Sequence, residues 1–224
     1  MPDRSVIQLS GDGSHTVISK IFEDVTYHSK HGAIAESNIV FIDAGLKYHF
    51  KKGKNKISIF EMGFGTGLNA LLSFLWSNDN NVRIDYQTVE AYPIDSSVFN
   101  NLNYSDILGA KQVFESFHNL DWNQNHIITE QFNFKKHLSL IEDLSIDKCF
   151  DVVFYDAFAP SSQPHLWELP ILNKMYQILN DGGVLVSYCA QGAFKRNLKS
   201  CGFTIESIPG PPGKREMTRA IKIT

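Results

Sequence analysis

The sequence predicts an α/β domain with a mostly parallel sheet that ends in an antiparallel edge hairpin, preceded by a small β-rich N-terminal extension. First, short apolar runs typical of strands alternate with helical patterns between residues 57 and 191. Second, a glycine-rich turn separates the first of these strands from its helix. Third, no helix separates the last two predicted strands, at 203–208 and 217–223. Alternating strands and helices imply right-handed crossovers and parallel pairing, so we expect an extension over 1–56 and a main domain over 57–224.

The length and composition of the chain fit one globular domain. Of its 224 residues, 43% are hydrophobic, which supports a substantial core. The N-terminus lacks the pattern of a signal peptide, and no apolar run approaches the length of a membrane span. The three cysteines form no C-x-x-C pair and are expected as buried free thiols of a reducing compartment. We therefore expect a cytoplasmic protein that makes no membrane contact.

The N-terminal extension is predicted to hold two hairpins. The turn sequence GDG separates apolar runs at 6–10 and 15–19. A second hairpin is expected to pair residues 39–42 with 46–50 around the sequence DAG.

The main domain is expected to contain five strands, each followed by a helical pattern, before the closing hairpin. These strands are predicted at 57–62, 82–90, 126–130, 150–155 and 184–189. The run at 150–155 is almost entirely apolar, which is typical of a strand buried on both faces. Residues 104–122 form a mixed insertion whose pattern favours no single element.

The turn GFGTG at 63–67 is the first candidate ligand site. Glycines permit positive φ and close backbone approach, and the helix that follows offers free N–H groups to a polar ligand. The dinucleotide-binding motif has its third glycine where this chain has Leu68. Glu90 ends the next strand, where an acid can accept both hydroxyls of an adenosyl ribose. The alternative is a turn needed only for strand–helix packing, with Glu90 as an exposed acid.

A parallel sheet that ends in an antiparallel strand is typical of enzymes that use S-adenosylmethionine (SAM), whereas nicotinamide-binding sheets usually stay parallel. Together with the glycine turn, this ending predicts a Rossmann-like SAM-dependent methyltransferase fold. The residues expected around the cofactor are Glu61, Gly63, Phe64, Gly65, Thr66, Gly67, Asn69 and Glu90.

Asp156 is the candidate catalytic residue, because it follows the buried strand at 150–155 and precedes an aromatic residue and a proline. A carboxylate there can accept the N–H bonds of an amine nucleophile and aim its lone pair. Neutralising an amine with a pKa near ~10.4 at pH 7 costs about 4–5 kcal/mol. An adjacent carboxylate raises this cost, so we assign Asp156 to orienting the amine and accepting its proton. The alternative is an Asp156 that caps the following helix.

Four segments resemble a known family. The strings FEMGFGTGLNALL, DAFAPSSQPHLW and GPPGKREMTRAI, and the opening FEDVTYHSKHGAIAESNIVFIDAGL, are similar to the methyltransferase domain of the bifunctional tRNA 5-methylaminomethyl-2-thiouridine biosynthesis proteins (the MnmC-like family). The resemblance implies SAM as the methyl donor and the aminomethyl group of a tRNA wobble uridine as the acceptor. It also implies that the glycine turn and Glu90 hold SAM and that Asp156 lies beside the amine. The implied substrate-binding residues are Phe158 and Pro160 at the uracil, with Lys214, Arg215 and Glu216 at the mouth of the pocket.

The chain departs from the family pattern at two places. It lacks the C-terminal flavin oxidoreductase domain that exposes the free amine, so we expect either a separate enzyme that supplies the aminomethyl intermediate or a precursor that is made differently. The family usually places an acid after the third strand, toward the adenine, and here Asn133 is expected to serve instead.

Other features leave alternatives open. Tyr188 either lines the substrate pocket or packs in the core, and the basic residues of 191–224 either meet tRNA phosphates or form a solvated face. His28 and His31 share a helical spacing, but no cysteine or acid completes a metal site, so we expect no metal. Two rival functions remain: an aminopropyltransferase-like enzyme, and a non-catalytic methyltransferase-like module that binds RNA or protein.

Overall fold

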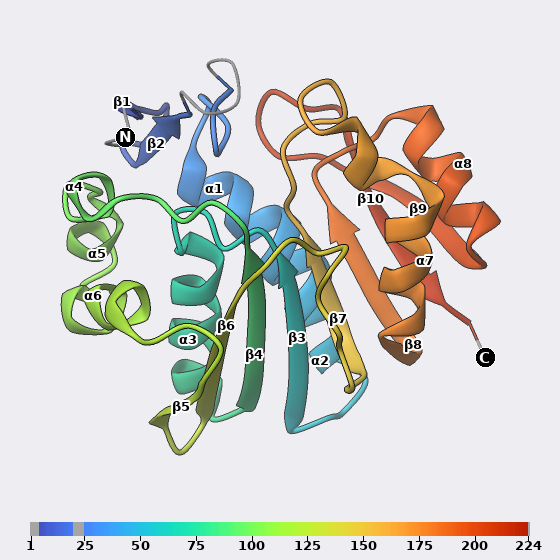
Figure 1. Cartoon of the computed structure of the whole chain (residues 1–224), viewed down its shortest axis with the longest axis horizontal. Helices are drawn as coiled ribbons and strands as arrows, with labels where there is room; N and C mark the ends of the chain where they lie inside the picture. The colour runs from blue at the N-terminus through green and yellow to red at the C-terminus, as the bar shows by residue number, and fades with distance from the viewer. Residues whose placement is uncertain (1–4, 20–24, 224) are drawn as a thin grey trace.

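An eight-stranded sheet forms the centre of the computed structural model, which describes residues 5–19 and 25–223 (Figure 1). Parts of the predicted extension, at 1–4 and 20–24, lie outside the described residues. The strands lie in the order β5-β6-β4-β3-β7-β8-β10-β9. Their bounds are β3 Lys56–Met62, β4 Arg83–Glu90, β5 Asn125–Thr129, β6 Phe132–Leu138, β7 Phe150–Tyr155, β8 Leu179–Ser187, β9 Phe203–Pro209 and β10 Glu216–Lys222.

Pairing within this sheet confirms the predicted fold class. The five central strands β6, β4, β3, β7 and β8 pair in parallel, whereas β10 is antiparallel to both β8 and β9. Every residue of β7 is buried, as its apolar sequence predicts. The parallel arrangement brings the carboxyl ends of β3, β4, β6, β7 and β8 to one edge of the sheet.

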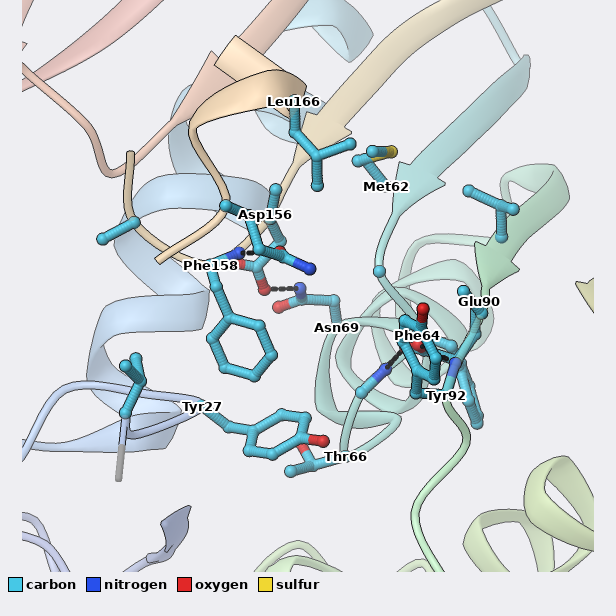
Figure 2. A pocket seen from close by; sticks show the side chains of 18 of the residues that line it. Tyr27, Met62, Phe64, Thr66, Asn69, Glu90, Tyr92, Asp156, Phe158 and Leu166 are labelled. Carbon is cyan, nitrogen blue, oxygen red and sulfur yellow. Dashed lines mark hydrogen bonds between the residues drawn. The ribbon is translucent and has the colours of Figure 1, made fainter. Parts of the chain in front are cut away.

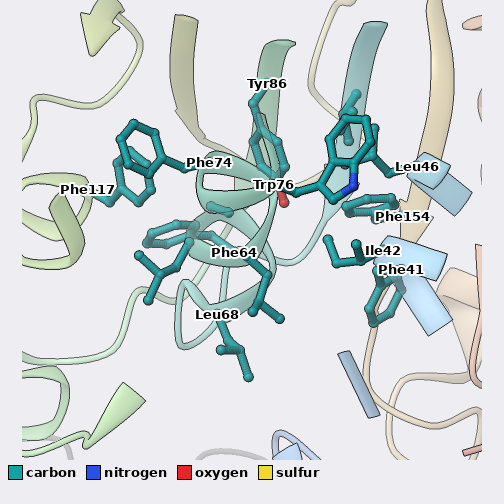
Figure 3. Close-up of a cluster of buried hydrophobic side chains, with 14 of the residues drawn as sticks. Phe41, Ile42, Leu46, Phe64, Leu68, Phe74, Trp76, Tyr86, Phe117 and Phe154 are labelled. Atoms are coloured by element: carbon teal, nitrogen blue, oxygen red, sulfur yellow. The ribbon is translucent and has the colours of Figure 1, made fainter. Parts of the chain in front are cut away.

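Helices cover both faces of the sheet (Figure 1). One face packs against α3 (Leu68–Asn80), α6 (Lys111–Asn119) and the helices before β3. Figure 3 shows part of the buried hydrophobic cluster between these helices and the sheet. The other face packs against α7 (Leu169–Gln177) and α8 (Gly192–Ser200). The shorter helical elements are α4 (Ser96–Phe99), α5 (Tyr104–Ile107) and the 3-10 turn η2 (Pro164–Trp167). Residues 104–122, which the sequence left unassigned, thus contain α5 and α6.

The first predicted hairpin is confirmed, and the second is wrong. Strands β1 (Val6–Leu9) and β2 (His15–Ile18) pair antiparallel across the GDG turn. Residues 33–50 are instead helical throughout, as α1 (Ala33–Ser37), the π-helix η1 (Asn38–Lys47) and α2 (Tyr48–Phe50).

Packing explains why the sequence DAG does not turn the chain. A Cβ on Gly45 would lie 2.9 Å from Val186 and 3.1 Å from Phe154, so this glycine allows the helix to approach the sheet closely. Phe41 and Leu46 are buried against the same face. The apolar residues therefore follow the period of a helix, and tertiary contact overrides the local turn signal.

The third predicted strand is present, but it is an antiparallel edge strand rather than one of the parallel strands. Strand β5 overlaps 126–130, yet it is antiparallel to β6, and the helix expected after it is the strand β6 itself. The burial of Phe132, Phe134 and Lys136 alternates with more exposed neighbours, which is the period of a strand.

Candidate functional site

A cavity of about 440 Å³ lies at the carboxyl ends of the parallel strands, where open α/β sheets bind ligands (Figure 2). The glycine turn, the residues that follow β4, β6 and β7, and residues 25–29 of the N-terminal extension form its wall. The predicted residues that line it are Gly63, Phe64, Gly65, Thr66, Asn69, Glu90, Asp156, Phe158, Tyr188 and Lys214.

The glycine turn has the conformation that the sequence predicts. Gly65 has a φ of +50°, and a Cβ there would lie 3.1 Å from the ring of Tyr27. Gly63 has a φ of +90°, and its Cβ would lie 3.1 Å from the carbonyl oxygen of Asp156. A side chain at either position would therefore crowd its neighbour, so glycine allows the turn to lie close to Asp156 and Tyr27.

Glu90 fixes the glycine turn to the end of β4. Its Oε2 accepts the N–H of Gly65 at 3.0 Å, and its Oε1 accepts the N–H of Tyr92 at 2.8 Å. Burial raises the pKa of this carboxyl, while the backbone N–H groups of Gly65, Tyr92 and Ala91 oppose the rise. Each carboxylate oxygen keeps a further lone pair, so Glu90 can still accept hydroxyl groups of a ligand.

Asp156 follows β7 and is held by α3. The amide Nδ2 of Asn69 donates to its Oδ2 at 2.8 Å (Figure 2). Burial and the negative charge of Glu36 raise the pKa of Asp156 to about 7, while the Asn69 bond and Lys214 lower it. The next helical element begins only at Pro164 and is preceded by Gln163, so Asp156 is not a helix cap. This carboxyl can therefore exchange a proton near neutral pH.

Glu61 does not reach the cavity surface. Its side chain is fully buried beside Tyr86 and Thr88, which point from β4 toward the same face of the sheet. Burial raises the pKa of Glu61 to about 8. The predicted direct cofactor contact is thus not supported. Successive side chains of β3 point to opposite faces of the sheet, and that of Glu61 points into the helix layer.

Asn133 is also misplaced by the sequence prediction. It is the second residue of β6, exposed and paired with Asp85, far from the carboxyl end of the strand. Ser139 and Leu140, which follow the end of β6, line the cavity instead. Phe132 and Phe134 alternate with polar residues in the sequence, and this strand-like period is the signal that would have located β6 and its end.

A second cavity of about 550 Å³ adjoins the first. Ala159, Tyr188 and Lys214 line both cavities. The predicted substrate residues Pro160, Arg215 and Glu216 line only the second. The hydroxyl of Tyr188 donates to the carbonyl oxygen of Ala157 at 2.8 Å, so Tyr188 both packs and lines the junction.

The N-terminal extension contributes residues that the sequence gave no sign of. Tyr27 packs edge-to-face on Phe158, with ring centroids 4.8 Å apart, and both rings face the first cavity (Figure 2). His28 Nε2 lies 2.7 Å from the hydroxyl of Thr66 in the glycine turn. Burial lowers the pKa of His28 to about 4, so this contact involves a neutral ring at pH 7. The extension therefore completes the wall of the site.

Ion pairs use many of the basic side chains near the C-terminus. Lys195 contacts Glu216 at 3.1 Å, and Arg219 contacts Glu206 at 2.7 Å. These pairs reduce the charge that the segment can offer to a polyanion. Within residues 5–19 and 25–223, no group of three or more His, Cys, Asp or Glu side chains could hold a metal ion. In the same described residues, no helix combines the length and apolar character needed to cross a bilayer.

The mostly parallel sheet, the glycine turn after β3 and the acid at the end of β4 define an α/β protein of the nucleoside-cofactor-binding class. Residues 111–223 match the model of a family described as "S-adenosyl-L-methionine-dependent methyltransferase", which is half of the chain. The chain therefore belongs to this family of SAM-dependent methyltransferases.

Curated relatives extend the likeness to nearly the whole chain. The tRNA 5-methylaminomethyl-2-thiouridine biosynthesis bifunctional protein MnmC of Ralstonia nicotianae is 29% identical over 95% of this chain and 34% of its own length. The protein of the same name from Acinetobacter baylyi is 31% identical over 94% of this chain and 36% of its own. The chain thus spans about a third of the length of these relatives.

Solved structures confirm the fold. The crystal structure of MnmC2 from Aquifex aeolicus superposes with a TM-score of 0.78 at 24% identity, covering 99% of this chain and 71% of that one. A putative class I SAM-dependent methyltransferase from Listeria monocytogenes gives a TM-score of 0.50 at 16% identity, covering 87% of this chain and 64% of that one.

Proposed function

We propose that this protein binds SAM in the first cavity and methylates the 5-aminomethyl group of a tRNA wobble uridine. The observation that carries the proposal is the position of Asp156, a carboxyl that titrates near pH 7, in the same cavity as the glycine turn. The names of the MnmC relatives support the tRNA substrate.

The shape and chemistry of the first cavity fit the proposed cofactor. Its volume of about 440 Å³ lies within the range of small-molecule sites. The backbone of Gly63 and Gly65 lines the cavity, so a ligand can lie against it, and Glu90 offers acceptors for ribose hydroxyls. Ser139 and Leu140 would border the adenine. When bound, SAM supplies a methyl group on a positively charged sulfur.

Asp156 would orient the acceptor and take up its proton. An acceptor that arrives as R–NH₃⁺ loses one proton to the carboxylate of Asp156, and the electron pair of the broken N–H bond remains on nitrogen. Asn69 holds this carboxylate by its Oδ2, so the other oxygen is available to the amine. A pKa near 7 reduces the free-energy cost of this transfer compared with an ordinary aspartate.

The second cavity would receive the part of the substrate that surrounds the amine. It joins the first at Ala159, Tyr188 and Lys214, so a base held near Phe158 and Pro160 would direct its aminomethyl group toward Asp156. A tRNA substrate would place the reaction in the cytoplasm.

The direct test is mass spectrometry of wobble nucleosides from a strain that lacks this gene. We expect 5-aminomethyl-2-thiouridine to accumulate and the methylated nucleoside to return when the gene is restored. An unchanged nucleoside profile would contradict the proposed substrate.

Thermal protection of the purified protein separates the rival functions. We expect SAM to raise Tm more than decarboxylated SAM does. The reverse order would favour an aminopropyltransferase. No protection by SAM at millimolar concentration would favour a module without turnover.

A further inference from the structure

A second carboxylate, that of Glu36, faces the first cavity from helix α1. Glu36 is only 5% exposed, yet it lines the cavity together with Asp156. Its Oε2 accepts the N–H of Ser29 at 2.7 Å, and its Oε1 lies 2.6 Å from Nζ of Lys214. These contacts hold the Glu36 carboxylate in one orientation, as buried charges require.

Lys214 stands at the junction of the two cavities. Its Nζ lies 3.9 Å from the ring centroid of Tyr188, and both residues line both cavities. The loop that carries it fits closely against the N-terminal extension, because a Cβ on Gly213 would overlap the ring of His31. Two segments far apart in sequence thus bring a cation to Glu36.

Acids outnumber lysines in the wall of the first cavity. Glu36 and Asp156 line it together with Glu90 and Glu142, and Lys214 is the cation that pairs with Glu36. The charge of Asp156 in turn contributes to the raised pKa of Glu61 on β3, which is about 8, and to the raised pKa of Tyr188, which follows β8, so both groups are mainly neutral at pH 7. With Glu36 and Asp156 ionised, the cavity has an excess of negative charge, which favours a cationic acceptor.

We infer that Glu36 is a specificity-determining residue for a protonated primary amine, and that Lys214 balances its charge so that the amine can still be deprotonated. The inference rests on the proposed function, since it concerns the acceptor of the same reaction. Glu36 attracts the ammonium group, and Asp156 takes the proton. Lys214 prevents the two carboxylates together from holding the ammonium too strongly to release it.

The test compares two RNA hairpins that differ only at the wobble uridine, which carries a 5-aminomethyl group in one and a neutral 5-hydroxymethyl group in the other. The Kd of each is measured for the full chain. We expect wild type to prefer the aminomethyl hairpin. Glu36→Gln keeps the acceptor for Ser29 but loses the charge, so this preference should fall about 10- to 100-fold, with unchanged affinity for the hydroxymethyl hairpin.

Glu206→Gln is the matched control, because it breaks the ion pair with Arg219 between β9 and β10, outside both cavities. It should keep the wild-type preference. A Glu36→Gln protein that also keeps it, or that weakens both hairpins equally, would show that Glu36 only ties the two segments together. If Glu36→Gln does not fold, Lys214→Met provides the test: it should increase the preference for the charged hairpin, and a decrease would overturn the inference.

A titration without RNA separates this inference from the proposed function. The carboxyl of Asp156, followed by ¹³C NMR, should titrate at lower pH in Glu36→Gln and at higher pH in Lys214→Met. Unchanged titration midpoints of Asp156 in both variants would overturn the inference that Glu36 and Lys214 balance the charge beside it. If wild type prefers neither RNA hairpin but the variants shift these midpoints as expected, the proposed acceptor is contradicted. The inferred effect of Glu36 and Lys214 on Asp156 would then still hold.

Discussion

Replacing Gly65 by alanine tests whether the glycine turn is a ligand cradle. The φ of +50° at Gly65 is left-handed, and an L-residue there costs about 1–2 kcal/mol. For a chain of this length, such a loss lowers Tm by roughly 2–8 °C. The new Cβ would also lie 3.1 Å from the ring of Tyr27, which lines the cavity, so this ring must be displaced. We expect a folded protein whose SAM affinity falls at least about tenfold, measured by calorimetry.

Gly182→Ala provides the matched control. Gly182 has a φ of +74°, and its Cβ would meet no atom within 4 Å. The backbone cost is therefore similar, whereas no ligand wall is disturbed. Both variants should lose similar thermal stability, and only Gly65→Ala should lose SAM binding. Wild-type affinity in Gly65→Ala, or an equal loss in both variants, would refute the cradle.

Three further outcomes are expected. Asp156→Asn should leave SAM affinity nearly unchanged and reduce kcat by about 10²–10⁴-fold, since the proton acceptor is lost; equal turnover would remove the proposed role. Because Asp156 accepts a proton only when ionised and its pKa is about 7, kcat/KM should rise with pH through pH 7, being about tenfold lower at pH 6 than at pH 8; a flat profile from pH 6 to 8 would contradict this assignment. Phe41→Ala should lower the free energy of unfolding by about 3–5 kcal/mol in a denaturant titration, because η1 buries this ring against Phe154; a loss below about 1 kcal/mol would argue against the helix packed on the sheet.

Local sequence signals located the parts of the site that lie at strand ends. The glycine turn, Glu90 and Asp156 each follow an apolar run directly, and parallel pairing brings such ends together. Glu61 and Asn133 were not placed correctly, because their positions depend on side-chain direction and on where β6 begins. An error of one residue in a predicted strand turns every side chain of that strand to the opposite face of the sheet.

The sequence by itself determined the α/β class, the parallel order with its antiparallel edge, and the turn that opens the ligand site, because these depend on periodicity and on glycine. Only the tertiary structure decided that residues 33–50 are helical, since Gly45 is a packing contact rather than a turn. It also decided that Tyr27, His28 and Glu36 belong to the cavity and that Lys214 pairs with Glu36. The physical reason is that these contacts join segments distant in the chain, and burial and neighbouring charges set the pKa of Asp156 only once those segments have met.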